Sequence, residues 1–168
     1  MSFSLSLQPD QSDEQIYHDL LPQIKSLLDP NDNIISNLSN FTALLQQAFT
    51  KISWVGFYLY DGSRLVLGPF QGKVACTSIV PGKGVCGAAA AQRITFIVPD
   101  VHAFPGHIAC DTGSNSEIVV PMVRNGKLIG VLDLDSYLLN AFSTVDQKYL
   151  EQAVHFICND ILNKDSIF

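Results

Sequence analysis

The spacing of apolar residues changes twice along the chain, and this change constrains the fold more than any other feature. Over residues 12–50 apolar side chains recur every three or four positions, which predicts amphipathic helices. Residues 52–137 are rich in β-branched and aromatic side chains between turn residues, which predicts short strands. Helical spacing returns over residues 143–163. A block of strands between helical ends indicates an α+β fold with an antiparallel sheet.

Helix-capping residues support this division. Ser12 with Gln15 matches a capping box, and Ser143 with Asp146 matches the same N-terminal pattern. The stripes are Ile16, Leu20, Ile24, Leu27 and Leu28; then Ile34, Leu38, Phe41, Leu45 and Phe49; and finally Leu150, Val154, Ile157 and Ile161. We interpret them as core faces, with a dimer seam as the alternative for the first two. Cys158, beside the last stripe, is expected only to pack.

The central region is expected to hold about six strands, linked mostly as hairpins. The expected strands are 52–60, 65–70, 74–80, 95–98, 117–123 and 128–135, with an Ala-rich helix over 84–92. Asp61-Gly62 and Asn125-Gly126 are strong tight-turn pairs. Residues 99–116 show no sustained period and predict a long loop, which in a compact domain is usually functional or mobile.

Size and charge exclude several classes of function. The 168 residues suit one domain spanning 1–168. The net charge is −6 and basic residues do not cluster, so nucleic acid and anionic membranes are not expected partners. No apolar run approaches the roughly 18 residues of a membrane span. The N-terminus lacks the basic flank of a secretory signal, so we expect a cytoplasmic protein whose cysteines rest as thiols.

Three cysteines lie in positions that differ from one another. Cys76 falls on an expected strand, Cys86 at the start of the Gly-rich helix, and Cys110 in the long loop, three residues after His107. Their spacing does not fit a structural zinc site, so no metal is expected. The high apolar content and the expected cytosolic compartment argue against a secreted disulfide framework. A helix N-terminus and Lys83 are expected to stabilise a Cys86 thiolate. Spacing alone leaves both redox chemistry and simple packing open.

Three acidic residues stand at the ends of otherwise apolar strands. Asp133 and Asp135 are two positions apart on one strand and therefore share a face, and Glu117 begins the preceding strand. As a cluster, they would keep one carboxyl protonated near neutral pH. A solvated strand end is the alternative. Trp54 and Tyr58 also share a face of their strand, where core packing is the default interpretation.

Whether these acids meet depends on the strand register. With a two-residue turn at Asn125-Gly126 and unbroken pairing, Glu117 would oppose Leu134 and point away from both aspartates. We therefore predict one of two departures. Either residues 124–126 form a three-residue loop that places Glu117 opposite Asp133, or a bulge interrupts the ladder near Pro121.

Six segments carry motifs that are specific in combination. They are WVGFY at 54–58, LGPFQGK at 67–73, GKGVCG at 82–87, VPDVHAFPGHIACD at 98–111, SEIVVP at 116–121 and GVLDLDS at 130–136. Together they resemble the free methionine-(R)-sulfoxide reductases, which are GAF-domain proteins. The resemblance covers about residues 15–160, and the 98–111 segment is its most specific part.

The resemblance implies a GAF-like fold, with N- and C-terminal helices on one side of an antiparallel sheet. It also implies reduction of free L-methionine (R)-sulfoxide to methionine. Cys110 would attack the sulfoxide sulfur, and Cys76 or Cys86 would resolve the resulting sulfenic acid as a disulfide. Thioredoxin would then be the electron donor, with no bound cofactor.

The resemblance further implies roles for the other candidates. Glu117, Asp133 and Asp135 would bind the substrate amino group and the sulfoxide oxygen, while Trp54 and Tyr58 would wall the methyl-bearing end. A homodimer is expected, because GAF domains commonly pair through their flanking helices. The main alternative is a ligand or redox sensor without turnover. A thiol peroxidase fits less well, since it has no use for three carboxylates.

Overall fold

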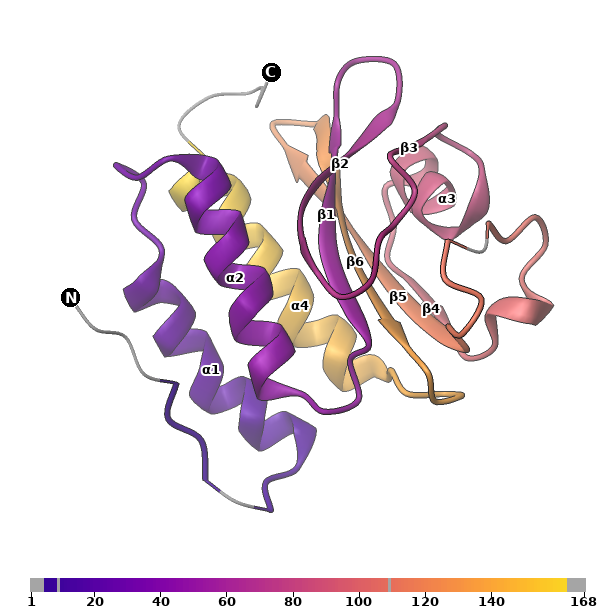
Figure 1. Cartoon of the computed structure of the whole chain (residues 1–168). Coiled ribbons are helices and arrows are strands. Elements are labelled where there is room, and N and C mark those ends of the chain that lie inside the picture. Colours follow the sequence, from indigo (N-terminus) through magenta and orange to yellow (C-terminus); the bar gives the residue numbers. More distant parts are fainter. Residues whose placement is uncertain (1–4, 9, 109, 163–168) are drawn as a thin grey trace.

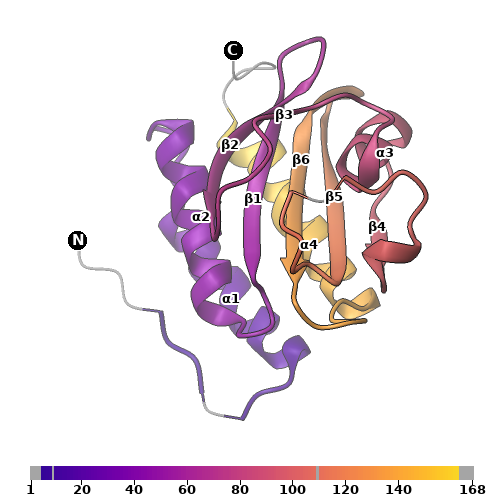
Figure 2. The same cartoon turned by 45° about the vertical axis from the view of Figure 1, so that its right-hand side comes forward.

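A six-stranded antiparallel sheet, in the order β3-β2-β1-β6-β5-β4, organises the computed structural model, which describes residues 5–8, 10–108 and 110–162 (Figures 1 and 2). The strands are β1 Trp54–Tyr60, β2 Leu65–Gln71, β3 Ser78–Ile79, β4 Phe96–Val98, β5 Ser116–Arg124 and β6 Lys127–Ser136. Neighbouring strands pair antiparallel. The predicted α+β architecture is therefore confirmed.

Helices lie on both sides of this sheet and differ in character. Helices α1 (Asp13–Leu27), α2 (Ile34–Ala48) and α4 (Thr144–Phe156) cover one face, and α4 continues into the π-helical segment η2 (Ile157–Ile161) (Figure 1). The short helices α3 (Gly84–Gln92) and η1 (Val101–Ala103) lie on the opposite side. Within the described residues, every helix is too short or too polar to cross a bilayer.

The apolar stripes of the long helices form the main core with the inner face of the sheet. Leu20, Leu38 and Leu132 are fully buried in this cluster. The capping boxes at Ser12 and Ser143 are both present, as predicted. The α2 and α4 stripes pack against the sheet and the α1 stripe packs against α2 and α4, so the interpretation of all three as core faces is confirmed. Cys158 is also fully buried there, so the prediction that it packs is confirmed.

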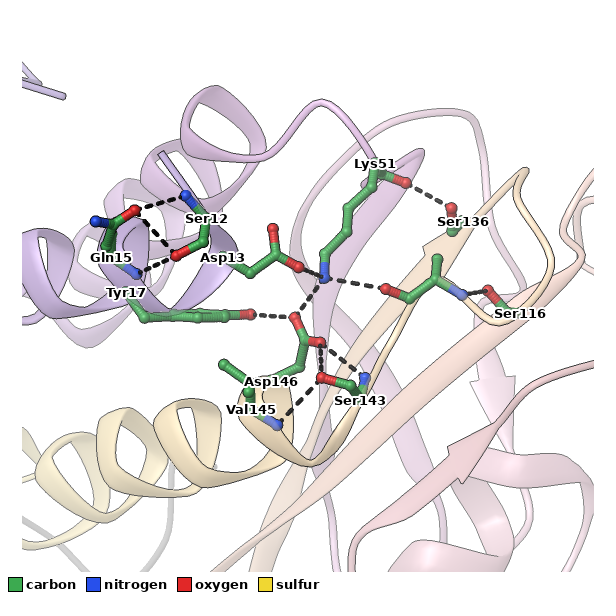
Figure 3. Close-up of polar contacts among 11 residues, drawn as sticks. Ser12, Asp13, Gln15, Tyr17, Lys51, Ser116, Ser136, Ser143, Val145 and Asp146 are labelled. Atoms are coloured by element: carbon green, nitrogen blue, oxygen red, sulfur yellow. Dashed lines mark hydrogen bonds and ion pairs between the residues drawn. The ribbon is translucent and has the colours of Figure 1, made fainter. Parts of the chain in front are cut away.

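A cluster of charges is enclosed between the helices and the end of β6. Lys51 Nζ lies 2.6 Å from Asp13 Oδ2 and 2.6 Å from Asp146 Oδ1, and it donates to the Ala141 carbonyl (Figure 3). The Tyr17 hydroxyl donates to the same Asp146 oxygen at 2.9 Å. We call Lys51, Asp13 and Asp146 the helical-side ion cluster. Its buried carboxylate has both a cation and a hydroxyl as partners.

The β5–β6 connection differs from one of the two predicted alternatives. Asn125 and Gly126 both have positive φ values, 50° and 74°, and Arg124 pairs with Lys127. These are the features of a two-residue hairpin turn whose twist matches the strands. The predicted three-residue loop over 124–126 is therefore wrong. Its physical reason is that Asn and Gly both tolerate the left-handed region.

The second alternative, a bulge near Pro121, is confirmed. Met122 pairs with Gly130 whereas Val123 pairs with Leu128, so Ile129 is an extra residue in β6. An extra residue shifts the register of everything beyond it by one position. Beyond the bulge, each residue of β5 therefore pairs one position further along β6 than it would in an unbroken ladder. This shift determines the face on which the acidic residues lie.

Candidate active site

The bulge brings the three acidic side chains onto the sheet face that is not covered by the long helices. Glu117 of β5 lies opposite Asp135 of β6, which in turn pairs with Trp54 of β1, while Asp133 pairs with Gly56. The shared face is as predicted. The predicted partner of Glu117 is wrong, because the extra residue in β6 shifts the ladder toward Asp135 rather than Asp133.

Burial changes the protonation of this acid cluster, by which we mean Glu117, Asp133 and Asp135. Only 5% of Glu117 and 6% of Asp133 is exposed. Burial raises the pKa of Glu117 well above its usual value, and the charges of both aspartates raise it further. Burial raises the pKa of Asp133 to about 6. For Asp135, burial and the Asp133 charge raise the pKa, opposed by a Ser114 hydrogen bond.

Burial and mutual repulsion therefore raise the pKa values within the acid cluster, which favours the protonated form as predicted. The alternative of a solvated strand end is wrong, because α3 packs against β5 and β6 and because His107 and Ser114 line the same cavity as the acids. Enclosure by these segments removes the water that would otherwise stabilise three ionised carboxyl groups.

Cys86 enters the same cluster from the first turn of α3. Only 4% of the residue is exposed, and its thiol donates to Glu117 Oε1 with a sulfur–oxygen distance of 3.9 Å. Burial raises the pKa of the Cys86 thiol well above its usual value, and the charges of Asp133 and Glu117 add to the effect. The predicted Cys86 thiolate is therefore wrong. Desolvation and two acids outweigh the helix N-terminus and Lys83.

Cys76 and Cys110 form a disulfide, with their Cα atoms 5.5 Å apart. Cys110 lies in the long loop, as predicted, and is exposed. Cys76 lies outside any strand, because the expected strand over 74–80 is reduced to Ser78–Ile79. Val74 is 87% exposed, so the apolar side chains of this segment do not all pack against the sheet. The sequence left the pairing open between Cys76 and Cys86.

Two aromatic side chains of β1 hold the connection that carries Cys76. The Trp54 indole N–H donates to the Lys73 carbonyl at 3.0 Å, and the Tyr58 hydroxyl donates to the Cys76 carbonyl at 3.0 Å. A Cβ atom at Gly56 would collide with the Trp54 ring, so glycine lets the indole lie along the strand. Trp54 and Tyr58 are therefore buried, as expected, but they pack on the pocket side of the sheet.

The loop that carries Cys110 is anchored through Asp111. This carboxylate accepts from the Tyr137 hydroxyl at 2.9 Å and from the Gly113 N–H at 2.9 Å, and it lies 3.2 Å from Lys73 Nζ. The Gly113 N–H, followed by the Tyr137 hydroxyl and Lys73, lowers the pKa of Asp111. Since Lys73 belongs to the Cys76 connection, this ion pair joins the two segments that the disulfide also joins.

All the predicted site residues line one cavity except Cys76, which is bonded to the lining residue Cys110. The lining residues are Trp54, Tyr58, Val74, Ala75, Ile79, Lys83, Gly84, Val85, Cys86, His107, Ile108, Cys110, Asp111, Ser114, Glu117, Asp133 and Asp135. Sequence reasoning missed Ser114 as a site residue, because a serine in a polar loop gives no distinguishing pattern.

Within the described part of the chain, one group has donor atoms arranged as in a metal site. Single donor atoms of Cys86, Glu117 and Asp133 lie within 4.8 Å of one another. Metal ligands must be deprotonated, whereas burial favours the protonated forms of this thiol and of both carboxyl groups. The donor set is therefore suited to holding protons or binding an organic cation.

Comparison with known proteins agrees with this geometry. The model of the GAF domain family matches residues 38–157. The chain is 46% identical to the free methionine-R-sulfoxide reductase of Escherichia coli (strain K12), over 83% of this chain and 85% of that protein. It is 54% identical to GAF domain-containing protein A of Dictyostelium discoideum, over 88% of this chain and 94% of that protein.

The chain belongs to the free methionine-R-sulfoxide reductase family. A solved structure of the Neisseria meningitidis free methionine-R-sulfoxide reductase in complex with its substrate is 44% identical and has a TM-score of 0.84, covering 94% of this chain and 92% of that chain. The GAF fold and the family expected from the motifs are therefore confirmed. Members of this family include the protein of Saccharomyces cerevisiae, which is 45% identical over 92% of this chain and 88% of its own length.

Proposed function

We propose that this chain reduces free L-methionine (R)-sulfoxide to L-methionine by thiol chemistry. The observation that carries the proposal is the disulfide between Cys76 and Cys110, which lies at a cavity containing three buried carboxyl groups. A redox-active sulfur and a protonated acid are the two groups that sulfoxide reduction needs. Family relatives named as enzymes of this activity support it.

In the proposed reaction, the Cys110 thiolate attacks the sulfoxide sulfur. Glu117, which carries a proton near neutral pH, donates it to the sulfoxide oxygen as the sulfur–oxygen bond breaks. The protonated oxygen is transferred to the Cys110 sulfur as the bond between the two sulfurs breaks, so methionine leaves and Cys110 becomes a sulfenic acid. The Cys76 thiol then condenses with this sulfenic acid, which forms the disulfide and releases water. The Cys76–Cys110 bond supports Cys76, rather than buried Cys86, as the resolving thiol.

The acid cluster also suits recognition of a free amino acid. One oxygen of Asp133, Oδ1, is buried and has no hydrogen-bond partner among the described residues. A substrate ammonium group would pair with Asp133 and Asp135, and a peptide-bound methionine has no such group to offer. Trp54 and Tyr58 provide an apolar wall for the methyl-bearing end of the substrate.

We propose thioredoxin as the reductant and the cytoplasm as the compartment. Thioredoxin has a reduction potential of about −270 mV and can reduce an accessible disulfide. Cys110 is exposed, so an external thiol can reach it. Reducing cytosol keeps thiols available between turnovers. No bound prosthetic group takes part, because the electrons come from the external dithiol.

The proposal is tested by following NADPH oxidation with thioredoxin, thioredoxin reductase and the purified protein. We expect turnover of free L-methionine (R)-sulfoxide and at least about 100-fold slower turnover of the (S) epimer and of the N-acetylated substrate. The physical reason is that loss of the ammonium leaves buried acids unpaired. Comparable rates on the N-acetylated substrate would contradict the ammonium argument. Tight binding without methionine formation would favour the sensor instead.

We also propose a homodimer, as expected from the resemblance. The stripes of α1 and α2 belong to the main core, so a dimer must use other parts of these helices. Sedimentation equilibrium provides the test. A single 18.4 kDa species across micromolar concentrations would contradict the homodimer.

A further inference from the structure

One titratable side chain in the cavity has no part in the proposed mechanism. His107 lines the cavity, and only 16% of its side chain is exposed. Its Nδ1 atom is buried and has no hydrogen-bond partner among the described residues. Burial, followed by the nearby His102, lowers the pKa of His107, so the imidazole is neutral at pH 7 and able to accept a proton.

The nearest acid to this imidazole is the proposed proton donor. His107 Nδ1 lies 4.0 Å from Glu117 Oε2. The other oxygen, Oε1, faces the Cys86 thiol. Only 7% of the Glu117 side chain is exposed, against 16% for His107. The imidazole therefore lies beside the buried carboxyl group on a more accessible part of the cavity wall.

Local backbone structure fixes where the imidazole lies. The His107 N–H donates to the Phe104 carbonyl at 3.2 Å, and Gly106 has a φ of 74°, which closes this turn. The present separation from Glu117 is longer than a hydrogen bond and belongs to the disulfide form. Such contacts commonly tighten only when substrate is bound.

The proton balance of the reaction leaves a task for a group in this place. A thiol and a sulfoxide give a sulfenic acid and a sulfide, with no net uptake of protons. The Cys110 thiol must nevertheless lose a proton before it attacks, and Glu117 must regain the proton that it gives to the oxygen. His107 lines the same cavity as both residues and precedes Cys110 by three positions.

We propose that His107 returns to Glu117 the proton that the Cys110 thiol releases. The inference rests on the proposed function. His107 exchanges protons with the Cys110 thiol and with Glu117 and does not touch the sulfoxide. Neutral imidazole accepts the thiol proton on one nitrogen and passes a proton to the carboxylate from the other. The ring is then neutral again with its N–H on the opposite nitrogen, and proton exchange with water restores the starting tautomer before the next cycle.

The test measures methionine formed in a single turnover, so that reduction by thioredoxin does not limit the rate. Pre-reduced protein is mixed with L-methionine (R)-sulfoxide and quenched. His107→Ala is expected to slow methionine formation about 100-fold or more with little change in the substrate concentration at half-saturation. Added imidazole should restore much of the rate, which a purely structural defect would not allow.

Three further variants sharpen the result. His155→Ala, an exposed position on α4 outside the cavity, should keep the wild-type rate and show no response to imidazole. Imidazole should fail to rescue His107→Ala combined with Glu117→Gln. His107→Gln fills the space without relaying a proton, so it should be slow and not rescued, and it replaces His107→Ala if that variant does not fold.

Two outcomes would overturn the inference: a wild-type rate in His107→Ala or His107→Gln, or a slow His107→Ala that imidazole does not accelerate. Both leave the proposed function intact, because wild-type protein would still form one methionine per chain. If the wild type forms none, the proposed function fails and the relay fails with it.

Discussion

The two faces of the sheet both bury acidic side chains, but only on the helical side does a cation neutralise the buried carboxylate. On the helical side, Asp146 is fully buried and is paired with Lys51 and the Tyr17 hydroxyl. On the pocket side, Glu117 and Asp133 are almost as deeply buried. Among the described residues, neither has a Lys or Arg within ion-pair distance.

This difference separates a structural arrangement from a functional one. A buried charge with a cation and a hydrogen-bond donor is satisfied and needs no ligand. Buried acids without a cation must stay protonated or bind a cation from outside. We therefore expect substitutions on the helical side to change stability, and substitutions on the pocket side to change chemistry.

The largest expected effect is on the pocket side, where Cys110→Ser should abolish turnover because it removes the attacking sulfur. The thioredoxin-coupled assay measures this. Cys158→Ala, which alters the other side of the sheet, should keep its activity per folded molecule. Residual activity above about a tenth of wild type in Cys110→Ser would reassign the attacking sulfur, with Cys86 as the first candidate.

Replacement of Cys76 should have a different effect. Cys76→Ser should still form one methionine per chain in a single turnover but should recycle slowly, because the sulfenic acid has lost its partner thiol. The yield of methionine per chain from pre-reduced protein provides the measurement. A variant that forms no methionine in the first turnover would contradict the assignment of Cys76 as the resolving thiol.

On the helical side, Lys51→Met should lower the free energy of unfolding by about 3–5 kcal/mol, because it leaves Asp146 buried without its cation. Urea unfolding at pH 7 gives the measurement. Lys148→Met removes an exposed pair with Glu14 and should cost far less, because solvent screens that pair. Equal losses in the two variants would show that burial of the ion cluster has no special effect.

A further comparison concerns the pH dependence of stability, for which we expect a smaller change in the free energy of unfolding. The unfolded chain loses the Asp133 proton near 3.8, whereas the folded chain keeps it until about pH 6. The folded state therefore binds more protons in this window, and wild-type stability falls as the pH rises through it. Asp133→Asn lacks this contribution, so its stability should depend less on pH.

The expected difference between wild type and Asp133→Asn is about 1–3 kcal/mol between pH 4 and pH 6. Urea unfolding of both proteins at intervals of half a pH unit measures it. Removal of the Asp133 charge also lowers the pKa values of Glu117 and Asp135, which flattens the curve in the same direction. Parallel stability curves would contradict the raised pKa of Asp133.

Much of the fold could be predicted because its determinants are local. The capping boxes at Ser12 and Ser143 depend on residues three positions apart, and the helical stripes depend on a period of 3.6 residues. Motif content also predicted the family, because the 98–111 segment is long and specific. These features depend on residues close together in the sequence and not on contacts with distant parts of the chain.

The sequence predicted which residues form the site but not how they are arranged. The acid cluster and Trp54 were expected near one another, but the partner of Glu117 depends on the bulge at Ile129. The position of a bulge depends both on packing along the two strands and on the geometry of the turn. The isoleucine at position 129 is an ordinary strand residue and does not indicate a bulge there. The thiolate predicted for Cys86 failed for a similar reason, since its environment is made by Glu117 and Asp133 from other strands.

The sequence by itself therefore determined the elements, their order and the chemical groups available to the site. Only the tertiary structure decided which cysteine pairs with Cys110, which acids share a cavity, and which of the buried charges receives a cation. The physical reason is that desolvation and charge–charge interactions depend on distances between segments far apart in the chain. Local periodicity does not encode those distances.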